Sequence, residues 1–146
     1  EIMPSLVGSE MCIRDRVRVD HVGIAVKDLE KTLKAYEEFL GLKPESIDEY
    51  PDQKVKSAFI PIGESGIEVM ESTDPEGPVA KYIEAKGEGI QHISLGVDNI
   101  DEMIKTLKER GVKLTSDTPA EAKGARYTFI HPKSLGGLLV ELVEKK

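Results

Sequence analysis

The sequence predicts an α+β protein in which two tandem βαβββ modules pair into a curved, mixed β-sheet around a shared cleft. Three observations lead to this prediction. A pattern returns after 71 residues, apolar residues alternate as in a strand at the head of each copy, and a capped amphipathic helix follows each of these strands. Each copy alone is too small to bury its sheet, so we expect the copies to pair.

The head of the repeat carries a histidine in both copies. The segment VDHVGIAVKDLEKTL at 19–33 aligns with IQHISLGVDNIDEMI at 90–104, and His21 coincides with His92. In each strand the histidine shares one face with small residues, since alternate side chains point to the same side. The small side chains leave room beside each histidine. The residues concerned are Gly23 and Ala25 in the first copy, and Ser94 and Gly96 in the second.

The end of the repeat carries glutamates in both copies. GIEVME at 66–71 aligns with LVELVE at 139–144 at a shift of 73 residues. Polar residues that coincide inside apolar strands are unlikely to do so by chance, so they indicate a duplicated unit with duplicated polar positions. The pairs that coincide are Glu68 with Glu141 and Glu71 with Glu144.

Helices are predicted where the apolar period changes to that of an amphipathic helix. A helix over 29–40 begins after the N-cap Asp28 and stops at Gly41. A helix over 100–110 begins after Asn99, with Glu102 completing a capping-box pattern, and closes at Gly111. A short linker helix spans 78–87, between Pro78 and Gly87.

Strands fill the rest of both modules. The first strand of the first module is expected over 18–26, and the others near 42–49, 54–62 and 66–71, then 112–116, 125–131 and 138–143. Module one therefore covers 17–77, the linker helix 78–87, and module two 88–146, all within one domain over 17–146. Residues 1–16 show no strand or helix period, and we interpret them as a non-native or disordered head.

Composition limits the class of partner. The chain has 146 residues, 39% of them hydrophobic and 32% charged, which is typical of a globular domain. Its net charge of −7 argues against a nucleic-acid or membrane-surface partner. The single cysteine, Cys12, cannot form an internal disulfide, and this usage fits a cytoplasmic protein.

The duplicated polar positions predict a metal site. Two imidazoles and two carboxylates suit a divalent first-row ion such as cobalt, nickel, zinc, manganese or iron. Each residue alone has a simpler interpretation: a lone strand histidine is usually hydrogen-bonded, and a lone glutamate is usually solvated. The joint pattern favours a metal. The expected ligands are His21, Glu68, His92 and Glu141.

Four motifs together resemble the methylmalonyl-CoA epimerases of the vicinal oxygen chelate (glyoxalase/bleomycin resistance/dioxygenase) superfamily: DHVGIAVKDLEK, PDQKV, GEGIQHISLGVDNI and HPKSLGGLLVELVE. The resemblance covers residues 17–146 and implies the same glyoxalase-like fold. It implies that His21, His92 and Glu141 are metal ligands, with Glu68 as a fourth. It also implies an acyl-CoA substrate, and dimers are common among such proteins, so we expect a homodimer.

The activity that the resemblance implies is inversion of C2 of methylmalonyl-CoA, a step of propionate metabolism. Abstraction of the α-proton builds negative charge on the thioester oxygen, which a divalent ion can stabilise. Glu141 is the residue we expect to act as a catalytic acid or base. Co²⁺ is the favoured ion, while Ni²⁺, Mn²⁺, Zn²⁺ or Fe²⁺ would also suit these ligands.

The sequence departs from the family at three places. Some relatives carry a second catalytic glutamate where Ser57 stands, so the second proton carrier is unassigned. A second histidine is common where this chain has Gln91, which we expect to point away from the ligand face. The loop at 121–124 reads EAKG where the family often has GAHG, which leaves the details of substrate contact open.

Several other polar residues have ordinary interpretations. His131, before Pro132, is expected to be structural. A small cluster of cations could face CoA phosphates or could be ordinary solvated charges: Lys123, Arg126 and Lys133.

Three alternative functions stay open. A lactoylglutathione lyase shares the fold and the ligand set. A metal-dependent dioxygenase of the same superfamily needs only two histidines and one glutamate, so Glu68 as a fourth ligand weighs against it. A non-catalytic binding protein of the superfamily would lack the metal.

Overall fold

The structure is a computed structural model, and it describes residues 17–145. The predicted head at 1–16, with Cys12, lies outside the described residues. The helices are Leu29–Leu40 (α2), Pro78–Lys86 (α3) and Ile100–Glu109 (α4), with 3-10 turns at Pro51–Gln53 (η1) and Pro132–Leu135 (η2). The strands are Arg18–Ala25 (β1), Ser46–Tyr50 (β2), Val55–Ile62 (β3), Ser65–Ser72 (β4), Gly89–Gly96 (β5), Ala120–Ala122 (β6), Ala125–Ile130 (β7) and Val140–Lys145 (β8).

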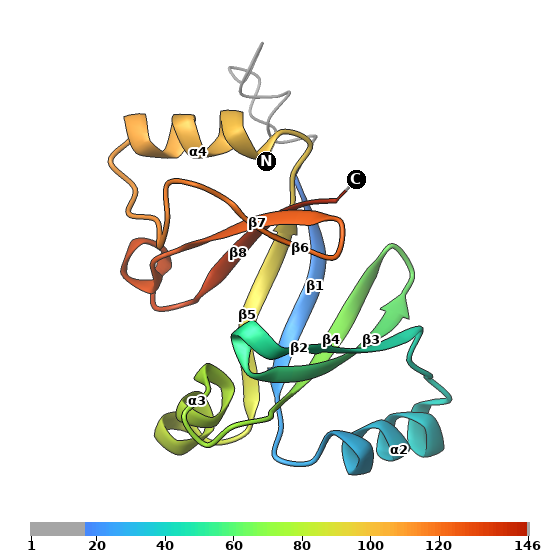
Figure 1. Cartoon of the computed structure of the whole chain (residues 1–146). Coiled ribbons are helices and arrows are strands. Elements are labelled where there is room, and N and C mark those ends of the chain that lie inside the picture. The colour runs from blue at the N-terminus through green and yellow to red at the C-terminus, as the bar shows by residue number, and fades with distance from the viewer. Residues whose placement is uncertain (1–16, 146) are drawn as a thin grey trace. The chain divides into compact units, whose positions relative to one another are not determined.

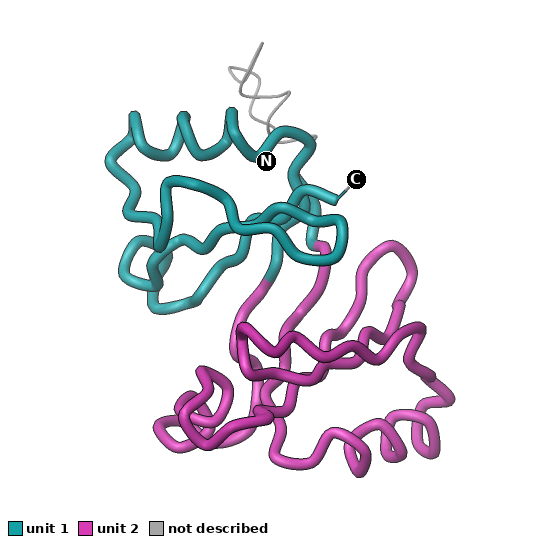
Figure 2. Tube along the Cα trace, viewed as in Figure 1, with its two compact units in different colours: residues 1–19, 94–146 teal, residues 20–93 magenta. Residues whose placement is uncertain are grey.

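The order of these elements confirms the predicted α+β class (Figure 1). The described residues form two compact units, shown in Figure 2: unit 2 comprises residues 20–93, and unit 1 comprises residues 17–19 and 94–145. Strands β1 and β5 each contribute residues to both units. Within the described residues, no helix has the length and apolar character needed to cross a membrane.

Unit 2 is a mixed sheet in the order β2-β3-β4-β1-β5. Strand β1 runs parallel to β4, whereas β3 is antiparallel to both β2 and β4. Helix α2 buries Leu29 against the strands and forms one core with residues of β3 and β4 and with Val26, which follows β1. That core consists of Val26, Leu29, Ala58, Ile60 and Val69.

Helix α3 covers a second core of unit 2. Val79 of α3 is buried with Ala25 of β1, Val55 of β3 and Met70 of β4. Pro78 starts the helix, as predicted, and Gly87 ends it at a φ of 85°, which favours glycine. Strand β1 therefore supplies side chains to two cores, Ile24 to the first and Ala25 to the second, and the candidate ligand His21 lies on the same strand.

Unit 1 repeats the arrangement in the order β5-β8-β7-β6. Helix α4 packs Ile100 and Ile104 onto Ile130 of β7 and onto β8, where Val140 and Leu142 are buried. Complete burial of an isoleucine such as Ile100 stabilises a fold by roughly 1.5–3 kcal/mol.

The predicted caps of both long helices are present. The Asp28 side chain accepts a hydrogen bond from the Lys31 N–H, and the Asn99 side chain accepts one from the Glu102 N–H. Gly41 ends α2 in the left-handed region at a φ of 69°, as predicted. Because unpaired N–H groups at a helix start are costly to bury, these caps fix where each helix begins.

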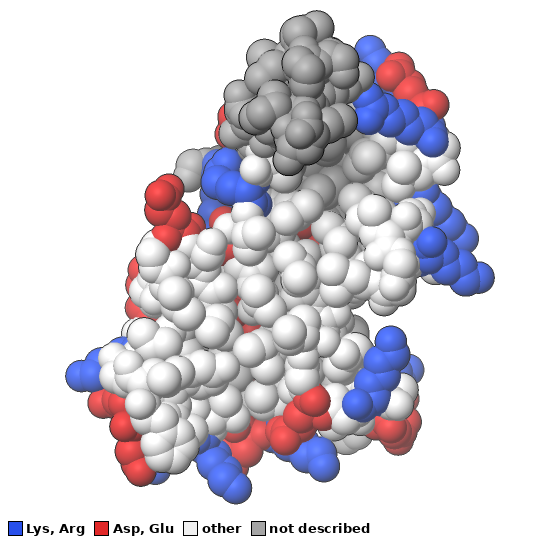
Figure 3. All heavy atoms as spheres, turned by 180° about the vertical axis from the view of Figure 1, so that it is seen from behind, with Lys and Arg blue, Asp and Glu red and all other residues white. Residues whose placement is uncertain are grey.

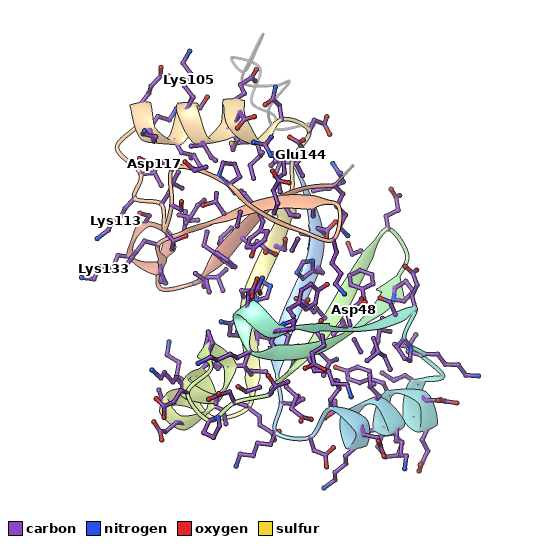
Figure 4. The ribbon with its side chains drawn as sticks, in the orientation of Figure 1. Asp48, Lys105, Lys113, Asp117, Lys133 and Glu144 are labelled. Carbon is purple, nitrogen blue, oxygen red and sulfur yellow. The ribbon has the colours of Figure 1, made fainter. Side chains whose placement is uncertain are left out.

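A glutamate carboxylate from a distant strand accepts a further backbone hydrogen bond at the start of each helix. Oε1 of Glu71, in β4, accepts from the Leu29 N–H at 2.6 Å. Oε1 of Glu144, in β8, accepts from the Ile100 N–H at 2.8 Å (Glu144 is labelled in Figure 4). The repeat that paired Glu71 with Glu144 in the sequence thus pairs two residues with one structural task.

The predicted strand at 112–116 is wrong. Only Leu114 makes a bridge there, to Ile130, and the strand of this region is instead β6, which the sequence did not predict. The Ser116 hydroxyl accepts from the Thr118 N–H and donates to the Thr118 carbonyl, so the chain turns before a ladder can form. The strand predicted at 42–49 begins only at Ser46, after Pro44.

Charged side chains of both signs are intermixed on the surface. On the face shown in Figure 3 they gather toward the margin, with acidic and basic residues side by side.

Candidate metal centre

The two repeated histidines meet in unit 2. His21 lies on β1 and His92 on the neighbouring strand β5, and their exposed fractions are only 8% and 4%. Their Nε2 atoms are 3.2 Å apart, and the rings stand edge to face. The sequence repeat therefore brings two imidazole nitrogens to one point.

Gly23 provides the space for the second ring. A Cβ atom on Gly23 would overlap Cε1, Nδ1 and Nε2 of His92, so no other residue fits without moving that ring. The room that small residues were predicted to leave beside a histidine is thus occupied by the histidine of the other copy.

Glu68 brings a carboxylate to the same point. It lies on β4 opposite Gly23 of β1, and its Oε1 is 3.4 Å from Nε2 of His21 and 3.7 Å from Nε2 of His92. The point equidistant from the three atoms is about 2 Å from each, close to the bond length of a first-row metal to imidazole or carboxylate. Three ligands of the predicted set thus have the spacing of one coordination shell.

Two residues that the sequence did not mark as part of the site contact the histidine rings on the Nδ1 side. Oδ2 of Asp20 is 2.7 Å from Nδ1 of His21, and Oε1 of Gln91 is 2.6 Å from Nδ1 of His92. The prediction that Gln91 points away from the ligand is therefore wrong. Its side chain is long enough to fold back to the ring of the next residue.

The charge state of Glu68 results from opposing influences. Burial would raise the pKa of this carboxyl, but its interactions with His21 and His92 and a hydrogen bond from Ser57 outweigh that effect, and the pKa lies below its usual value. Glu68 is therefore an anion that faces the two imidazoles. Ser57, 4% exposed, is a hydrogen-bond donor to a candidate ligand.

Glu141 lies on β8 of unit 1, opposite Phe129 of β7. Tyr127 is two residues before Phe129 and so shares its face of the sheet. Burial first, and then the negative charge of Glu141, raise the pKa of Tyr127, which keeps the phenol neutral. Tyr127 was not predicted as a site residue; only the cross-strand register reveals that it neighbours Glu141.

Two of the remaining polar residues singled out in the sequence, His131 and Arg126, have structural partners. Nδ1 of His131 accepts from the Lys133 N–H and caps η2, so the structural interpretation of His131 holds. Both guanidinium NH groups of Arg126 donate to Asp101 at 2.9 Å, so Arg126 forms an ion pair rather than presenting a free cation. Lys123 occupies a left-handed turn position at a φ of 46°.

The residues of unit 2 fit a divalent ion by their donor chemistry. An ionised carboxylate and an amide oxygen can only accept hydrogen bonds, so Asp20 and Gln91 favour a proton on Nδ1 of each histidine. Both Nε2 lone pairs then face Glu68 Oε1. Three lone-pair donors around one point are stabilised by a cation between them.

Comparison with known proteins assigns this chain to a family. Residues 20–129 match the model of the glyoxalase/bleomycin resistance protein/dioxygenase superfamily. The human mitochondrial methylmalonyl-CoA epimerase is 34% identical over 86% of this chain and 72% of its own length. A probable lactoylglutathione lyase of Vibrio cholerae is 32% identical over 88% of this chain and 91% of its own length.

A solved structure has the same fold with an acyl-CoA ligand. It is a variant of Streptomyces coelicolor methylmalonyl-CoA epimerase in complex with 2-nitronate-propionyl-CoA. That chain is 31% identical, with a TM-score of 0.85 over 89% of this chain and 95% of its own.

Proposed function

The chain belongs to the glyoxalase/bleomycin resistance protein/dioxygenase superfamily, and we propose that it is a metal-dependent epimerase that inverts C2 of methylmalonyl-CoA. The observation that carries the proposal is the triangle of His21 Nε2, His92 Nε2 and Glu68 Oε1 around one point. The similarity to methylmalonyl-CoA epimerases at 31–34% identity supports the choice of substrate.

We propose that Glu141 completes the ligand set. Its support is its place in the repeat, where it is the counterpart of Glu68, and the match of its VEL segment to the family motif. A bound divalent ion would supply Lewis acidity, which stabilises negative charge on the thioester oxygen of the substrate.

The protein's own groups must move the proton. In the proposed reaction, the Glu141 carboxylate accepts the proton from C2 on one face of the substrate, and a second group returns a proton to the opposite face, so that the overall composition is unchanged. A serine hydroxyl is too weak a base to replace a carboxylate at position 57. We therefore propose that Ser57 holds Glu68 in place rather than carrying the second proton.

The finer parts of the proposal concern the ion and the setting. We propose Co²⁺ as the ion, a homodimer as the assembly, the cytoplasm as the location and propionate metabolism as the context. Metal content of the protein purified from its native host tests the first, and sedimentation velocity tests the second. Lys123 and Lys133 stay candidates for contact with CoA phosphates.

A lactoylglutathione lyase is the second candidate, because the Vibrio cholerae relative is nearly as similar in sequence. Both activities move a proton beside a carbonyl, so the substrate decides between them. Formation of lactoylglutathione by the metal-loaded protein, without turnover of methylmalonyl-CoA, would favour this second function.

The test uses metal-free protein reloaded with Co²⁺. The protein is incubated with methylmalonyl-CoA in heavy water, and deuterium at C2 is followed together with loss of chirality. The proposal predicts exchange and racemisation that depend on the metal. Stoichiometric Co²⁺ without exchange would contradict the epimerase activity, and absence of bound Co²⁺ would contradict the metal site.

A further inference from the structure

The two candidate ligand histidines have the same kind of neighbour in both copies of the repeat. The residue immediately before each histidine places an oxygen on Nδ1, Asp20 at 2.7 Å from His21 and Gln91 at 2.6 Å from His92. An identical arrangement at two positions 71 residues apart indicates a shared task. The two acceptors differ in one respect, because one is a carboxylate and the other an amide.

The acceptors decide where the ring protons lie. An ionised carboxylate and an amide oxygen can only accept, so Nδ1 must be the donor in both contacts. A neutral imidazole protonated at Nδ1 keeps its lone pair on Nε2. The two Nε2 atoms that carry these lone pairs lie 3.2 Å apart, and Oε1 of Glu68 is within 3.7 Å of each.

We infer that Asp20 and Gln91 are positioning residues for the metal: each fixes the tautomer and the ring orientation of the next histidine, and the carboxylate of Asp20 makes His21 the stronger of the two ligands. The inference rests on the metal site of the proposed function. It goes beyond that site by assigning two residues that do not touch the ion.

His21 is the stronger metal ligand because its neighbour Asp20 is charged and both side chains are mostly buried. A carboxylate behind an imidazole increases the electron density that the ring offers to a metal, and such partners typically change metal affinity by 10–100-fold. The side chains of Asp20 and His21 are only 11% and 10% exposed, so water screens their interaction little. The amide of Gln91 orients His92 without this charge.

A purely structural ion pair is the rival interpretation. In it, a doubly protonated His21 donates to Asp20 and to Glu68 without any metal. The two interpretations differ in what Asp20 controls: metal affinity in the first, and stability of the metal-free protein in the second.

The test measures Co²⁺ affinity of the full chain by competition with a chromophoric chelator. Asp20→Asn should weaken Co²⁺ binding by roughly 10–100-fold, because it removes the negative charge behind the His21 ring. Gln91→Glu should tighten binding, a gain that partial misfolding cannot produce. Glu30→Gln removes the same charge from an 86%-exposed position of unit 2 and should leave the affinity unchanged.

Proton NMR of the Co²⁺-loaded protein provides a second readout. Two strongly shifted ring N–H signals should appear in water and disappear in heavy water, one from each Nδ1. In Asp20→Asn the signal of His21 should broaden as its exchange with water quickens, while that of His92 stays.

The outcomes separate this inference from the proposed function. Weaker binding in Asp20→Asn together with tighter binding in Gln91→Glu supports the inference. Wild-type affinity in both variants overturns it and leaves the metal site intact, as does an Asp20→Asn variant that loses only the stability of the metal-free protein. If the wild-type chain does not bind Co²⁺, the proposed function is contradicted as well.

Discussion

The two copies of the repeat place the same groups at the same strand positions and surround them differently. In the first copy, Asp20 holds His21, and Ser57 donates to Glu68. In the second copy, Gln91 holds His92, and the neighbour of Glu141 is a phenol, Tyr127. The register explains the match, since Ser57 and Tyr127 both lie two residues before the phenylalanine that faces the glutamate.

The difference teaches which parts of a duplicated site the backbone fixes. Ligand positions follow from strand alternation and register, and both copies keep them. The surrounding acceptors and donors depend on single side chains, and these have diverged. We interpret the first copy as the one that holds a ligand firmly, through Ser57, and the second as the one whose glutamate is available for proton transfer.

The largest expected effect is a difference in kcat between two variants, Glu141→Gln and Glu68→Gln. Glu141→Gln should lower kcat for epimerisation by roughly 10²–10⁴-fold, the usual loss of an acid–base group. Glu68→Gln should keep most of the activity, because an amide oxygen can still bind the ion. Deuterium exchange at C2 of methylmalonyl-CoA measures both, and equal losses in the two variants would contradict the division of roles.

The next largest expected effect is a difference in stability between variants of Gly23 and of its counterpart in the repeat, Ser94. A methyl group on Gly23 would displace the His92 ring, so Gly23→Ala should cost about 1–3 kcal/mol of stability, as overpacking does, and should weaken Co²⁺ binding. Among the described residues, the buried Ser94 hydroxyl has no hydrogen-bond partner.

Ser94→Ala should accordingly be neutral or stabilise the protein by about 1 kcal/mol, because it removes an unsatisfied buried hydroxyl. Urea denaturation of metal-free and Co²⁺-loaded protein measures both variants. A Gly23→Ala protein with wild-type Co²⁺ affinity would show that the ring position is not needed.

The sequence was sufficient where a local pattern carries the information. The caps Asp28 and Asn99 and the paired histidines were predicted from spacing alone, and the structure places them as expected. The Ser57–Glu68 hydrogen bond could not be predicted, because it depends on the register of β3 against β4. Gln91 was misassigned because strand alternation describes Cβ directions and not the reach of a long side chain.

The strand predicted at 112–116 failed for a related reason. Residues there alternate as a strand should, but a hydrogen-bonded turn at Ser116 limits them to one bridge.

A signal for the contacts of Asp20 and Gln91 was present in the sequence, since both residues precede a repeated histidine.

Removal of the carboxylate of Glu71 or Glu144 should lower the free energy of unfolding by less than Gly23→Ala does. The loss should be the same in both copies of the repeat. Glu71→Ala and Glu144→Ala each leave the first N–H of a helix without its carboxylate, which should lower the free energy of unfolding by about 0.5–2 kcal/mol. Chemical denaturation measures the change. A loss in only one variant would show that the two carboxylates do not share one structural task.

The smallest expected effect is a pH dependence that arises at the start of helix α4, where Asp101 pairs with Arg126. Arg126 donates two hydrogen bonds to Asp101 and lowers the pKa of that carboxyl below its usual 3.8, whereas its counterpart Glu30 lies 3.9 Å from Lys34. Because the folded pKa is the lower one, the stabilisation is present above the usual pKa and is lost as pH falls through the folded pKa.

Asp101→Asn should therefore flatten the fall of unfolding free energy as pH drops below about 5. Denaturation curves at low and high salt measure the slopes, and high salt should reduce the difference. Identical slopes for the wild type and Asp101→Asn would contradict the assignment.

Diffraction from crystals loaded with Co²⁺, recorded at the cobalt absorption edge, tests the central claim most directly. The account predicts one anomalous peak per chain, about 2.1 Å from Nε2 of both His21 and His92, with carboxylate oxygens of Glu68 and Glu141 in the same shell. A peak bound to only one of the two histidines, or no peak beside either, would contradict the claim that the two copies of the repeat share one metal ion.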